Sequence, residues 1–391
     1  ASKVFTVPVN GLKAQPGTEN LVNFRVTTTE PEPLIPTGYE IAYDQFQLPI
    51  QAEKSIYKAN GPALKTTIQG DKLIISSSKV NFVFNKNSGL VTSYKVDGTE
   101  YFKDGFGIQP NFWRAPNDND YGNSTPKRLQ IWKQSSKNFR ITDATMTAED
   151  KAVSLNVTYL LAAGNLYVVT YKIYPNGIVN VNAKFTSTDM QPTETEVSEA
   201  TRMATFTPGS DAARKAASKL EVPRIGVRFR LPAQMNNVQY FGRGPEENYI
   251  DRNHGTLVGV YKTTADQMNF YYVRPQENGL LTFSRWFALS PIIGKGLVLV
   301  ADSLIGFNAL RNSIEDFDSE EALPHPYQWN NFSPEEVANH DENAARNVLR
   351  RMHHVNDITP RDFVEVCVDM KQQGVGGYDS WGARPEPFLL Q

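Results

Sequence analysis

The segment Val80-Asn81-Phe82-Val83-Phe84 is followed closely by the turn-forming residues Asn87-Ser88-Gly89. In an extended chain, successive side chains point to opposite faces, so Val80, Phe82 and Phe84 lie together on one face. A short strand with one apolar face that ends at a tight turn is typical of an antiparallel sheet. This stretch therefore predicts an antiparallel β-sheet with one face on a hydrophobic core.

The same pattern recurs along most of the chain. Strands are predicted at residues 73–75, 152–157, 178–182 and 296–301, and turns at residues 97–98, 163–165 and 176–177. Strands do not alternate with helices, so a TIM barrel or a doubly wound parallel sheet is not expected. Many short strands separated by tight turns predict an all-β fold built from large antiparallel sandwiches.

Helices are expected to be few. Ser333 followed by Pro334 and two glutamates is a good start signal for a short helix over residues 334–338, with Ser333 as the cap. Residues 211–220 also have helical composition, between Pro208 and Pro223.

The first 55 residues differ from the rest. Strands are predicted around residues 24–26 and 39–43, with three prolines between them. This is too little for a whole sandwich and would leave an open sheet edge. We expect either a part of an immunoglobulin-like domain or a segment that pairs onto the main body. The boundary is expected near residues 51–62, giving domains of residues 1–55 and 56–391.

Composition excludes several classes of protein. The 391 residues carry 40 basic and 42 acidic side chains without a basic tract, so nucleic-acid binding is not expected. No stretch reaches the roughly 20 apolar residues of a membrane span, and no signal peptide opens the chain. We expect a soluble protein, cytoplasmic or periplasmic. The single cysteine, Cys367, lies in a predicted buried strand and is expected to be an inert core thiol.

The densest polar cluster is residues 112–120, Phe-Trp-Arg-Ala-Pro-Asn-Asp-Asn-Asp. Asn and Asp side chains after a proline favour turns because they accept hydrogen bonds from nearby backbone N–H groups. We expect a self-capped structural loop, with a metal loop or a sugar-contacting loop as the alternatives. The spacing of a calcium-binding EF-hand loop is absent.

Two further clusters contain carboxylates. In residues 242–252, we expect Glu247, Asp251 and Arg252 to form a partly buried ion-pair network; the alternative makes Glu246 or Glu247 a catalytic carboxylate. Residues 274–279 offer one carboxylate and amides able to hold hydroxyl groups, and here a structural role is again favoured.

The fourth cluster, residues 374–382, contains four glycines. Glycine lets the backbone take positive φ and approach other groups closely. Trp381 lies in this segment, and an exposed indole on a loop needs a partner. From the residues alone, a ligand contact and a structural contact are equally open for Trp381.

Metal and nucleophile motifs are absent from the sequence. The five histidines are His254, His325, His340, His353 and His354, and they form no HExxH motif. The adjacent His353 and His354 would face opposite sides of a strand and could not bind one ion together.

The four clusters, in this order, resemble the C-terminal domain of the β-galactosidases of glycoside hydrolase family 2. The family pattern reads approximately F-x-R-A-P-x-D-N-D, G-x-G-P-x-E-N-Y-x-D-R, P-x-E-N-G and G-x-G-G-D-D-S-W. It corresponds to residues 112–120, 242–252, 275–279 and 374–381, and residues 36–46 are similar to the end of the preceding domain. The resemblance thus covers nearly the whole chain.

The resemblance implies a β-supersandwich like that of galactose mutarotase, preceded by the remains of an immunoglobulin-like domain. In this family both catalytic residues are glutamates on a central TIM barrel, and retaining hydrolysis needs them about 5 Å apart. The barrel would precede residue 1, in a longer protein or a separate subunit. We therefore expect no catalytic residue here, an inactive isolated chain, and no cofactor, because the metal ions of the full enzyme would bind mainly the other domains.

The resemblance implies a substrate-binding role for Trp381. In the family this Trp reaches from the C-terminal domain to the mouth of the active site and stacks on the sugar. Asp379 and Ser380 would hold its loop, and the galactoside itself would bind mainly to the barrel. This sequence has Tyr378 where the family pattern has Asp, which changes the polar network of the loop. The family often assembles, so a homo-oligomer is possible.

Two other functions stay open. A non-catalytic carbohydrate-binding module would bind galactose or lactose without the barrel. An aldose 1-epimerase could share the predicted fold, but it needs a general acid and a general base, usually His and Glu, and the sequence has no recognisable motif for it.

Overall fold

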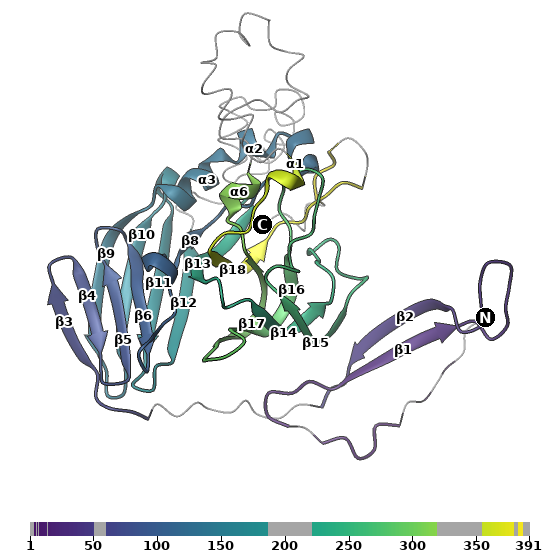
Figure 1. Ribbon diagram of the computed structural model, residues 1–391, viewed down its shortest axis with the longest axis horizontal. Helices are drawn as coiled ribbons and strands as arrows, with labels where there is room; N and C mark the ends of the chain where they lie inside the picture. Colours follow the sequence, from purple (N-terminus) through teal and green to yellow (C-terminus); the bar gives the residue numbers. More distant parts are fainter. Residues whose placement is uncertain are drawn as a thin grey trace, which may run out of the picture. The chain divides into compact units, whose positions relative to one another are not determined.

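The structure is a computed structural model that describes residues 4, 6, 8–13, 15–50, 60–186, 221–318, 354–378 and 382–385. The chain divides into two compact units, Ala1–Lys58 and Ala59–Gln391. Strands dominate the described residues of both units, which confirms the predicted all-β class (Figure 1).

Among the described residues of the first unit there is one antiparallel pair of strands, β1 (Leu21–Thr27) and β2 (Glu40–Gln47). Val22 faces Phe46 across the pair, and the rings of Phe24 and Phe46 meet edge to face at 5.8 Å. This apolar face is open: Phe24 is 38%, Val26 53% and Phe46 52% exposed. The assignment of residues 1–55 to an immunoglobulin-like domain stays a prediction.

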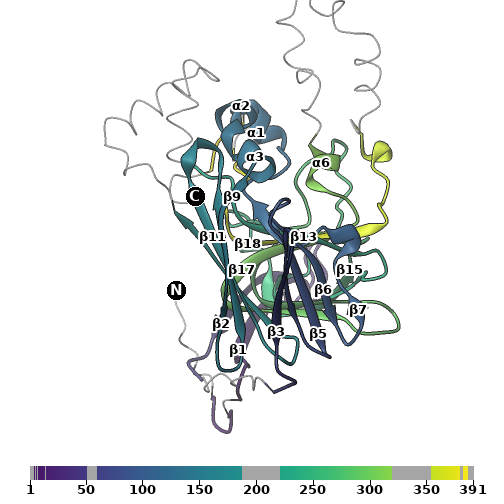
Figure 2. The same ribbon diagram turned by 90° about the vertical axis from the view of Figure 1, so that its left-hand side faces the viewer.

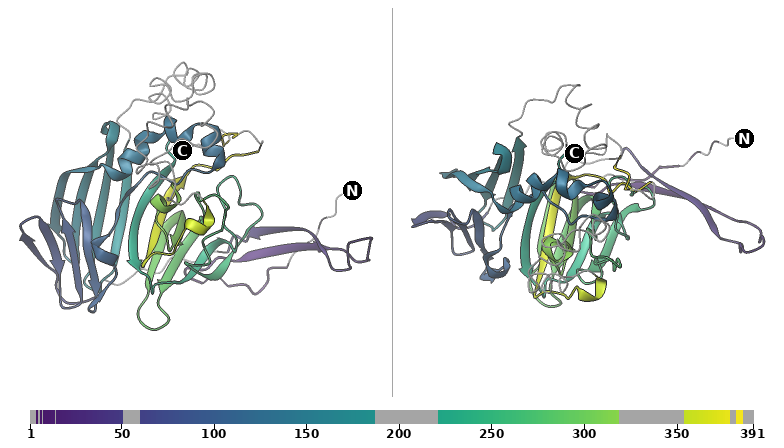
Figure 3. Two further views of the ribbon diagram at one scale, coloured as in Figure 1. Left: turned by 45° about the horizontal axis from the view of Figure 1, so that its top comes forward. Right: turned by 90° about the horizontal axis from the view of Figure 1, so that it is seen from above.

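The second unit contains three antiparallel sheets in the residues described, seen from different sides in Figures 1, 2 and 3. The five-stranded sheet has the order β3 (Lys65–Gln69), β4 (Lys72–Ser76), β5 (Val80–Asn85), β6 (Leu90–Val96) and β7 (Thr99–Glu100). The four-stranded sheet has the order β12 (Val179–Thr186), β11 (Leu166–Ile173), β10 (Val153–Leu160) and β9 (Arg140–Ala148). The seven-stranded sheet has the order β15 (Leu257–Thr264), β14 (Asn237–Gly244), β16 (Leu281–Ser290), β17 (Leu297–Leu310), β18 (Phe363–Gln372), β13 (Arg224–Pro232) and β8 (Gln109–Asn111).

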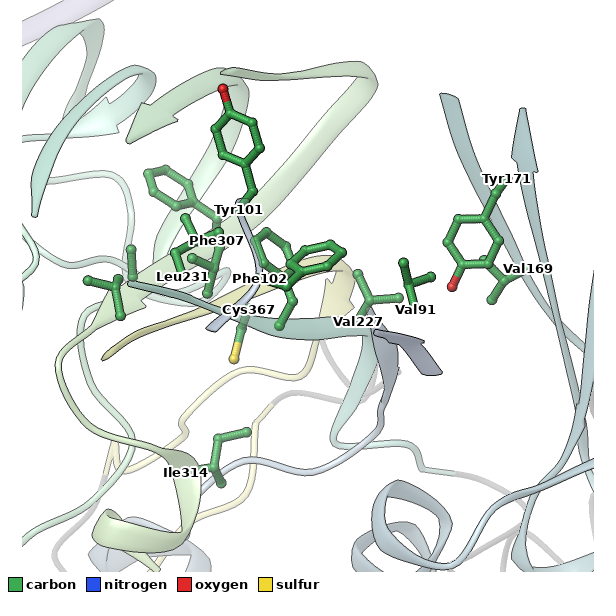
Figure 4. Packing of buried hydrophobic residues seen from close by; sticks show 14 of the residues in the cluster. Val91, Tyr101, Phe102, Val169, Tyr171, Val227, Leu231, Phe307, Ile314 and Cys367 are labelled. Carbon is green, nitrogen blue, oxygen red and sulfur yellow. The ribbon is translucent and has the colours of Figure 1, made fainter. Parts of the chain in front are cut away.

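One hydrophobic core joins these three sheets. The ring of Phe82 on β5 lies 5.5 Å from that of Tyr171 on β11, and Phe102 lies 5.8 Å from Phe229 on β13. Figure 4 shows Phe102, Val227, Val91 and Tyr171 in succession across this core. Since Val80, Phe82 and Phe84 are all buried, the face predicted from residues 80–84 is confirmed.

The predicted turns also have a clear physical cause. The side chain of Asn85 accepts hydrogen bonds from the backbone N–H groups of Asn87 and Ser88, and Gly89 has φ +71°. Asp97 and Gly98 both have positive φ, as a two-residue type I′ hairpin requires.

Three short helices begin at the end of the first polar cluster: α1 (Asp118–Gly122), α2 (Thr125–Arg128) and α3 (Gln130–Lys137). They lie together at one end of the sheets (Figures 1 and 2). The sequence did not predict them. The structure also has α6 (Ile314–Phe317) and the 3-10 turns η1 (Lys103–Gly105), η2 (Ala162–Gly164) and η5 (Val355–Asp357). The helices predicted at residues 211–220 and 334–338 lie outside the described residues. Within the described part of the chain, every helix is too short or too polar to span a bilayer.

Candidate functional site

The glycine-rich segment, residues 374–382, begins just after the end of β18. The described residues at its two ends lie close together. The backbone N–H of Gly377 donates to the carbonyl of Ala383 at 2.9 Å, so residues 377 and 383 close a loop. Gly377 has φ +80° and Gly382 has φ +83°. A Cβ atom on Gly382 would lie 2.7 Å from the Cα of Gly122 in α1, and one on Gly377 would collide with the side-chain amide of Asn119. Glycine is therefore needed here both for conformation and for close approach.

The first polar cluster supports this segment from one side. Arg114 is 2% exposed and donates to the carbonyls of Gln373 at 2.8 Å and Gly374 at 3.1 Å. The carboxylate of Asp120 holds the Arg114 guanidinium at 2.9 Å. Asp120 and Asn117 also form a capping box at the start of α1, so the predicted self-capped loop is confirmed and continues as a helix.

The second cluster supports the segment from another side. Asp251 accepts hydrogen bonds from the N–H groups of Val375 at 3.0 Å and Gly376 at 2.8 Å, and Arg252 donates to the Gly376 carbonyl at 2.9 Å. The predicted ion-pair network of Glu247, Asp251 and Arg252 is formed only in part: the positive charge of Arg252 favours the ionised form of Glu247, but Asp251 and Arg252 take other partners. In the structure as described, the two charged groups of Asp251 and Arg252 bind backbone of the glycine-rich segment instead of each other.

Glu247 feels the charge of Arg252, but its hydrogen bonds go to other groups. It accepts a hydrogen bond from the Tyr272 hydroxyl and another from the N–H of Gly279 at 2.7 Å. Burial raises the pKa of Glu247, and these two hydrogen bonds oppose the rise. Both of its carboxylate oxygens therefore have a structural hydrogen bond.

The third cluster links to the first at two points. The guanidinium of Arg274 lies 3.9 Å from the centre of the Tyr121 ring and 2.9 Å from a carboxylate oxygen of Asp118. The N–H of Glu277 donates to the carbonyl of Ala115 at 3.2 Å. The first three sequence clusters thus meet around the fourth, the glycine-rich segment.

A buried charge cluster lies beneath the segment. Arg224, on β13, is fully buried and donates hydrogen bonds to Glu277 at 2.8 Å and Gln372 at 2.7 Å. Its guanidinium also lies 3.1 Å from a carboxylate oxygen of Asp369, as an ion pair without a hydrogen bond. Gln372 is the last residue of β18, so this cluster fixes the point where the glycine-rich segment starts. The sequence analysis missed Arg224. Arg224, Arg228 and Arg230 are four and two residues apart in one strand, so their side chains lie on the same face. This spacing was a signal for a shared polar face.

One guanidinium faces two carboxylates in this cluster, and this affects their protonation. Burial raises the pKa of Asp369 from 3.8 to about 7; the Arg224 guanidinium opposes the rise, and Glu277 adds to it. Burial lowers the pKa of Arg224, but the two carboxylates outweigh it and the pKa ends above its ordinary value. Asp369 is therefore partly protonated near neutral pH.

A second missed cluster holds the end of the segment. Arg384, just past Gly382, pairs with Glu221, which also pairs with Arg128 of α2 at 3.2 Å. Burial lowers the pKa of both arginines to about 10. The charge of Asp120 opposes this lowering for Arg128, and the charge of Arg128 adds to it for Arg384. Both guanidinium groups stay charged at neutral pH and share one carboxylate.

The three residues predicted to form the substrate site, Asp379, Ser380 and Trp381, lie outside the described residues. Their neighbour Tyr378 is described and is 78% exposed. The structure therefore describes both sides of the predicted binding loop, and the binding role of its tip stays a prediction.

Other predicted groups take structural positions. Cys367 is a free thiol, 2% exposed, and burial raises its pKa well above the ordinary value, in agreement with an inert core position. His254 and His354 are exposed; the other three histidines lie outside the described residues. Among the described residues, no three His, Cys, Asp or Glu side chains are grouped as metal ligands.

The sequence matches the family model of the β-galactosidase small chain over residues 76–390. A β-galactosidase from Priestia megaterium is 30% identical over 352 residues, which are 90% of this chain and 28% of that protein. A β-galactosidase from Streptococcus thermophilus is 26% identical over 98% of this chain and 32% of that protein. One from Vibrio cholerae is 24% identical over 99% of this chain and 32% of that protein. The chain thus spans about a third of the length of these curated relatives.

The matched region contains the glycine-rich segment and the three other clusters that meet around it. It also covers well over half of the chain, and the all-β sheets of the second unit are formed within and just before it. The chain therefore belongs to the β-galactosidase small chain family.

Proposed function

We propose that this chain works as the C-terminal part of a β-galactosidase of glycoside hydrolase family 2 and that Trp381 contacts the galactoside at the mouth of the active site. The observation that carries this proposal is the convergence of the other three polar clusters on the glycine-rich segment, the third through its contact with the first. Side chains far apart in the sequence hold both sides of one short loop. Because several buried and charged side chains hold the two sides of the loop, a functional role for the loop tip is supported.

The catalytic carboxylates are proposed to lie in another part of the enzyme. Relatives named β-galactosidase are about three times as long as this chain. Around the segment, Glu277 is paired with a buried arginine, and Glu247 is bonded through both oxygens. A nucleophile or a general acid needs at least one oxygen free to reach the substrate, so these two groups are better explained as structural.

The first unit is proposed to be the end of an immunoglobulin-like sandwich. Its two strands carry Phe24, Val26 and Phe46 on one open face. An isolated two-stranded sheet is at best marginally stable in water, and further strands packed on that face would stabilise it. The match to the longer relatives supports this reading, since it extends through the first unit.

A ligand-observed NMR titration of the purified chain with lactose tests the role of Trp381. We expect weak saturable binding to the unmodified chain, loss of binding in Trp381→Ala, and unchanged binding in Trp286→Phe, which alters an aromatic side chain of β16. Equal binding by Trp381→Ala would overturn the assignment. Tight binding by the isolated chain would instead favour the carbohydrate-binding module.

A further inference from the structure

A small cavity lies inside the second unit, between β17, β18, α6 and the third cluster. Its volume is about 10 Å³, which is the size of one water molecule. Figure 4 shows two of its walls, with the sulfur of Cys367 and the side chain of Ile314 facing each other. The residues that line it are all buried, and five of them are polar: Glu277, Asn278, Asn308, Asn312 and Glu365.

The three asparagines on the wall use their NH₂ groups elsewhere. The NH₂ group of Asn278 donates to the carbonyl of Gln276 at 3.3 Å, and that of Asn308 donates to the carbonyl of Asn278 at 3.2 Å. The NH₂ group of Asn312 donates to the carbonyl of Thr359 at 2.8 Å. Because a carbonyl only accepts, these contacts fix which end of each amide is the nitrogen. Among the described residues, nothing donates to the three amide oxygens that remain.

The two glutamates on the wall differ in the same respect. Glu365 uses both of its oxygens: one accepts from Arg228 at 3.3 Å and the other from Arg230 at 2.8 Å. Glu277 accepts from Arg224 at 2.8 Å through Oε1, and its Oε2 accepts from none of the described residues. In these five side chains, every nitrogen or oxygen atom without a hydrogen bond is therefore an oxygen: three from amides and one from a carboxylate.

The charges beside the cavity also favour a cation. Arg224 faces two buried carboxylates, with Glu277 at 2.8 Å and Asp369 at 3.1 Å. Burying a carboxylate is unfavourable unless a positive charge lies close to it. Since Glu277 lines the cavity, a cation inside would lie beside this cluster and supply a second positive charge.

We propose that this cavity binds one monovalent cation of about the size of a water molecule, such as K⁺, through the amide oxygens of the three asparagines and a carboxylate oxygen of Glu277. Amide and carbonyl oxygens can replace the hydration shell of K⁺. A water molecule is the rival occupant, but its two hydrogens would serve at most two of the four oxygens. The ion would join the third cluster to β17 and to the turn before α6. This site does not depend on the proposed role of Trp381.

Thermal unfolding of the full chain in KCl, and in N-methylglucamine chloride of the same ionic strength, tests the proposal. A ligand that binds only the folded chain raises Tm as its concentration increases. We expect a saturable rise of about 3–5 °C in KCl when K⁺ reaches about 100 times its dissociation constant. LiCl should give a smaller rise, because Li⁺ is too small to contact all of the oxygens at once.

Two variants and a matched control place the effect at the cavity. Asn278→Leu and Asn308→Leu each remove one oxygen at nearly unchanged volume and should abolish most of the rise in KCl. The rise is a difference between two salts, so a variant of lower stability still reports it. The control is Asn111→Leu: Asn111 is also buried with side-chain atoms that lack a hydrogen bond, but it lies on β8 and not on the cavity wall. It should keep the full rise.

Crystals of the unmodified chain grown in thallium(I) acetate locate the ion directly, because Tl⁺ replaces K⁺ and scatters anomalously. One anomalous peak should lie between the three asparagine side chains. No peak, with a water molecule or no density in the cavity, would overturn the proposal. So would a rise in KCl that survives in both leucine variants, since the cation would then bind elsewhere. A peak without any rise in KCl would mean binding at crystal concentration only, and would also overturn it.

Discussion

Replacing Asp369 by asparagine removes the titratable carboxyl from the buried cluster with Arg224 and Glu277 while keeping the shape of the side chain. In the folded chain, the pKa of Asp369 is raised from 3.8 to about 7, chiefly by burial. In the unfolded chain the carboxyl is exposed and titrates near its ordinary value. Between these two pKa values the folded chain binds more protons than the unfolded chain.

This difference sets both the sign and the size of the effect. The contribution of Asp369 to the free energy of unfolding is greatest below pH 3.8 and is lost progressively as the pH rises to about 7. Each pH unit in this interval corresponds to about 1.4 kcal/mol, so about 2–3 kcal/mol should be lost between pH 5 and pH 7. Asparagine does not titrate, so Asp369→Asn should lack this loss.

Urea unfolding of both chains at pH 5, 6, 7 and 8 measures the effect, because the contributions of groups that do not interact with Asp369 cancel in the difference. The free energy of unfolding of Asp369→Asn minus that of the unmodified chain should rise by about 2–3 kcal/mol from pH 5 to pH 7 and then level off. The exposed control Asp266→Asn should show no such rise. A difference for Asp369→Asn that is independent of pH would refute the reasoning.

Three further predictions concern the same region. Arg224→Met should lower the free energy of unfolding by about 3–5 kcal/mol, because it leaves two buried carboxylates without their guanidinium partner; urea unfolding at pH 8 measures this, and a near-zero change would contradict it. Gly377→Ala should destabilise the chain more than Gly98→Ala in thermal unfolding, since the two glycines have nearly equal φ but only Gly377 is packed against a side chain; equal losses would argue against that contact. Cys367 should react with a thiol reagent only when urea unfolds the chain, and rapid labelling of the folded chain would show that the thiol is accessible.

The strands could be predicted because their signal is local. The alternation in residues 80–84 places β5 and its buried face, and Asp97-Gly98 places a hairpin turn. The helices α1 to α3 could not be predicted in the same way. A helix such as Asp118–Gly122 spans little more than one turn, so it has no apolar periodicity to read, and its capping residues also suit a loop.

The candidate site was predictable as a set of clusters but not as a set of contacts. The glycines of residues 374–382 indicated close approach of the backbone to other groups, and Gly377 and Gly382 do lie close to α1. The sequence placed Asp251 and Arg252 next to each other and suggested that they pair, but backbone groups more than one hundred residues away compete for them. Arg224 was overlooked because its partners, Glu277 and Asp369, are distant in sequence and only the sheet brings them together.

The central claim is that this chain helps to bind the galactoside and that the catalytic carboxylates belong elsewhere in the enzyme. The most direct test is the rate at which the purified chain hydrolyses a chromogenic β-galactoside. We expect no rate above that of buffer. Saturable turnover that persists through repeated purification and disappears in Glu247→Gln or Glu277→Gln would contradict the account.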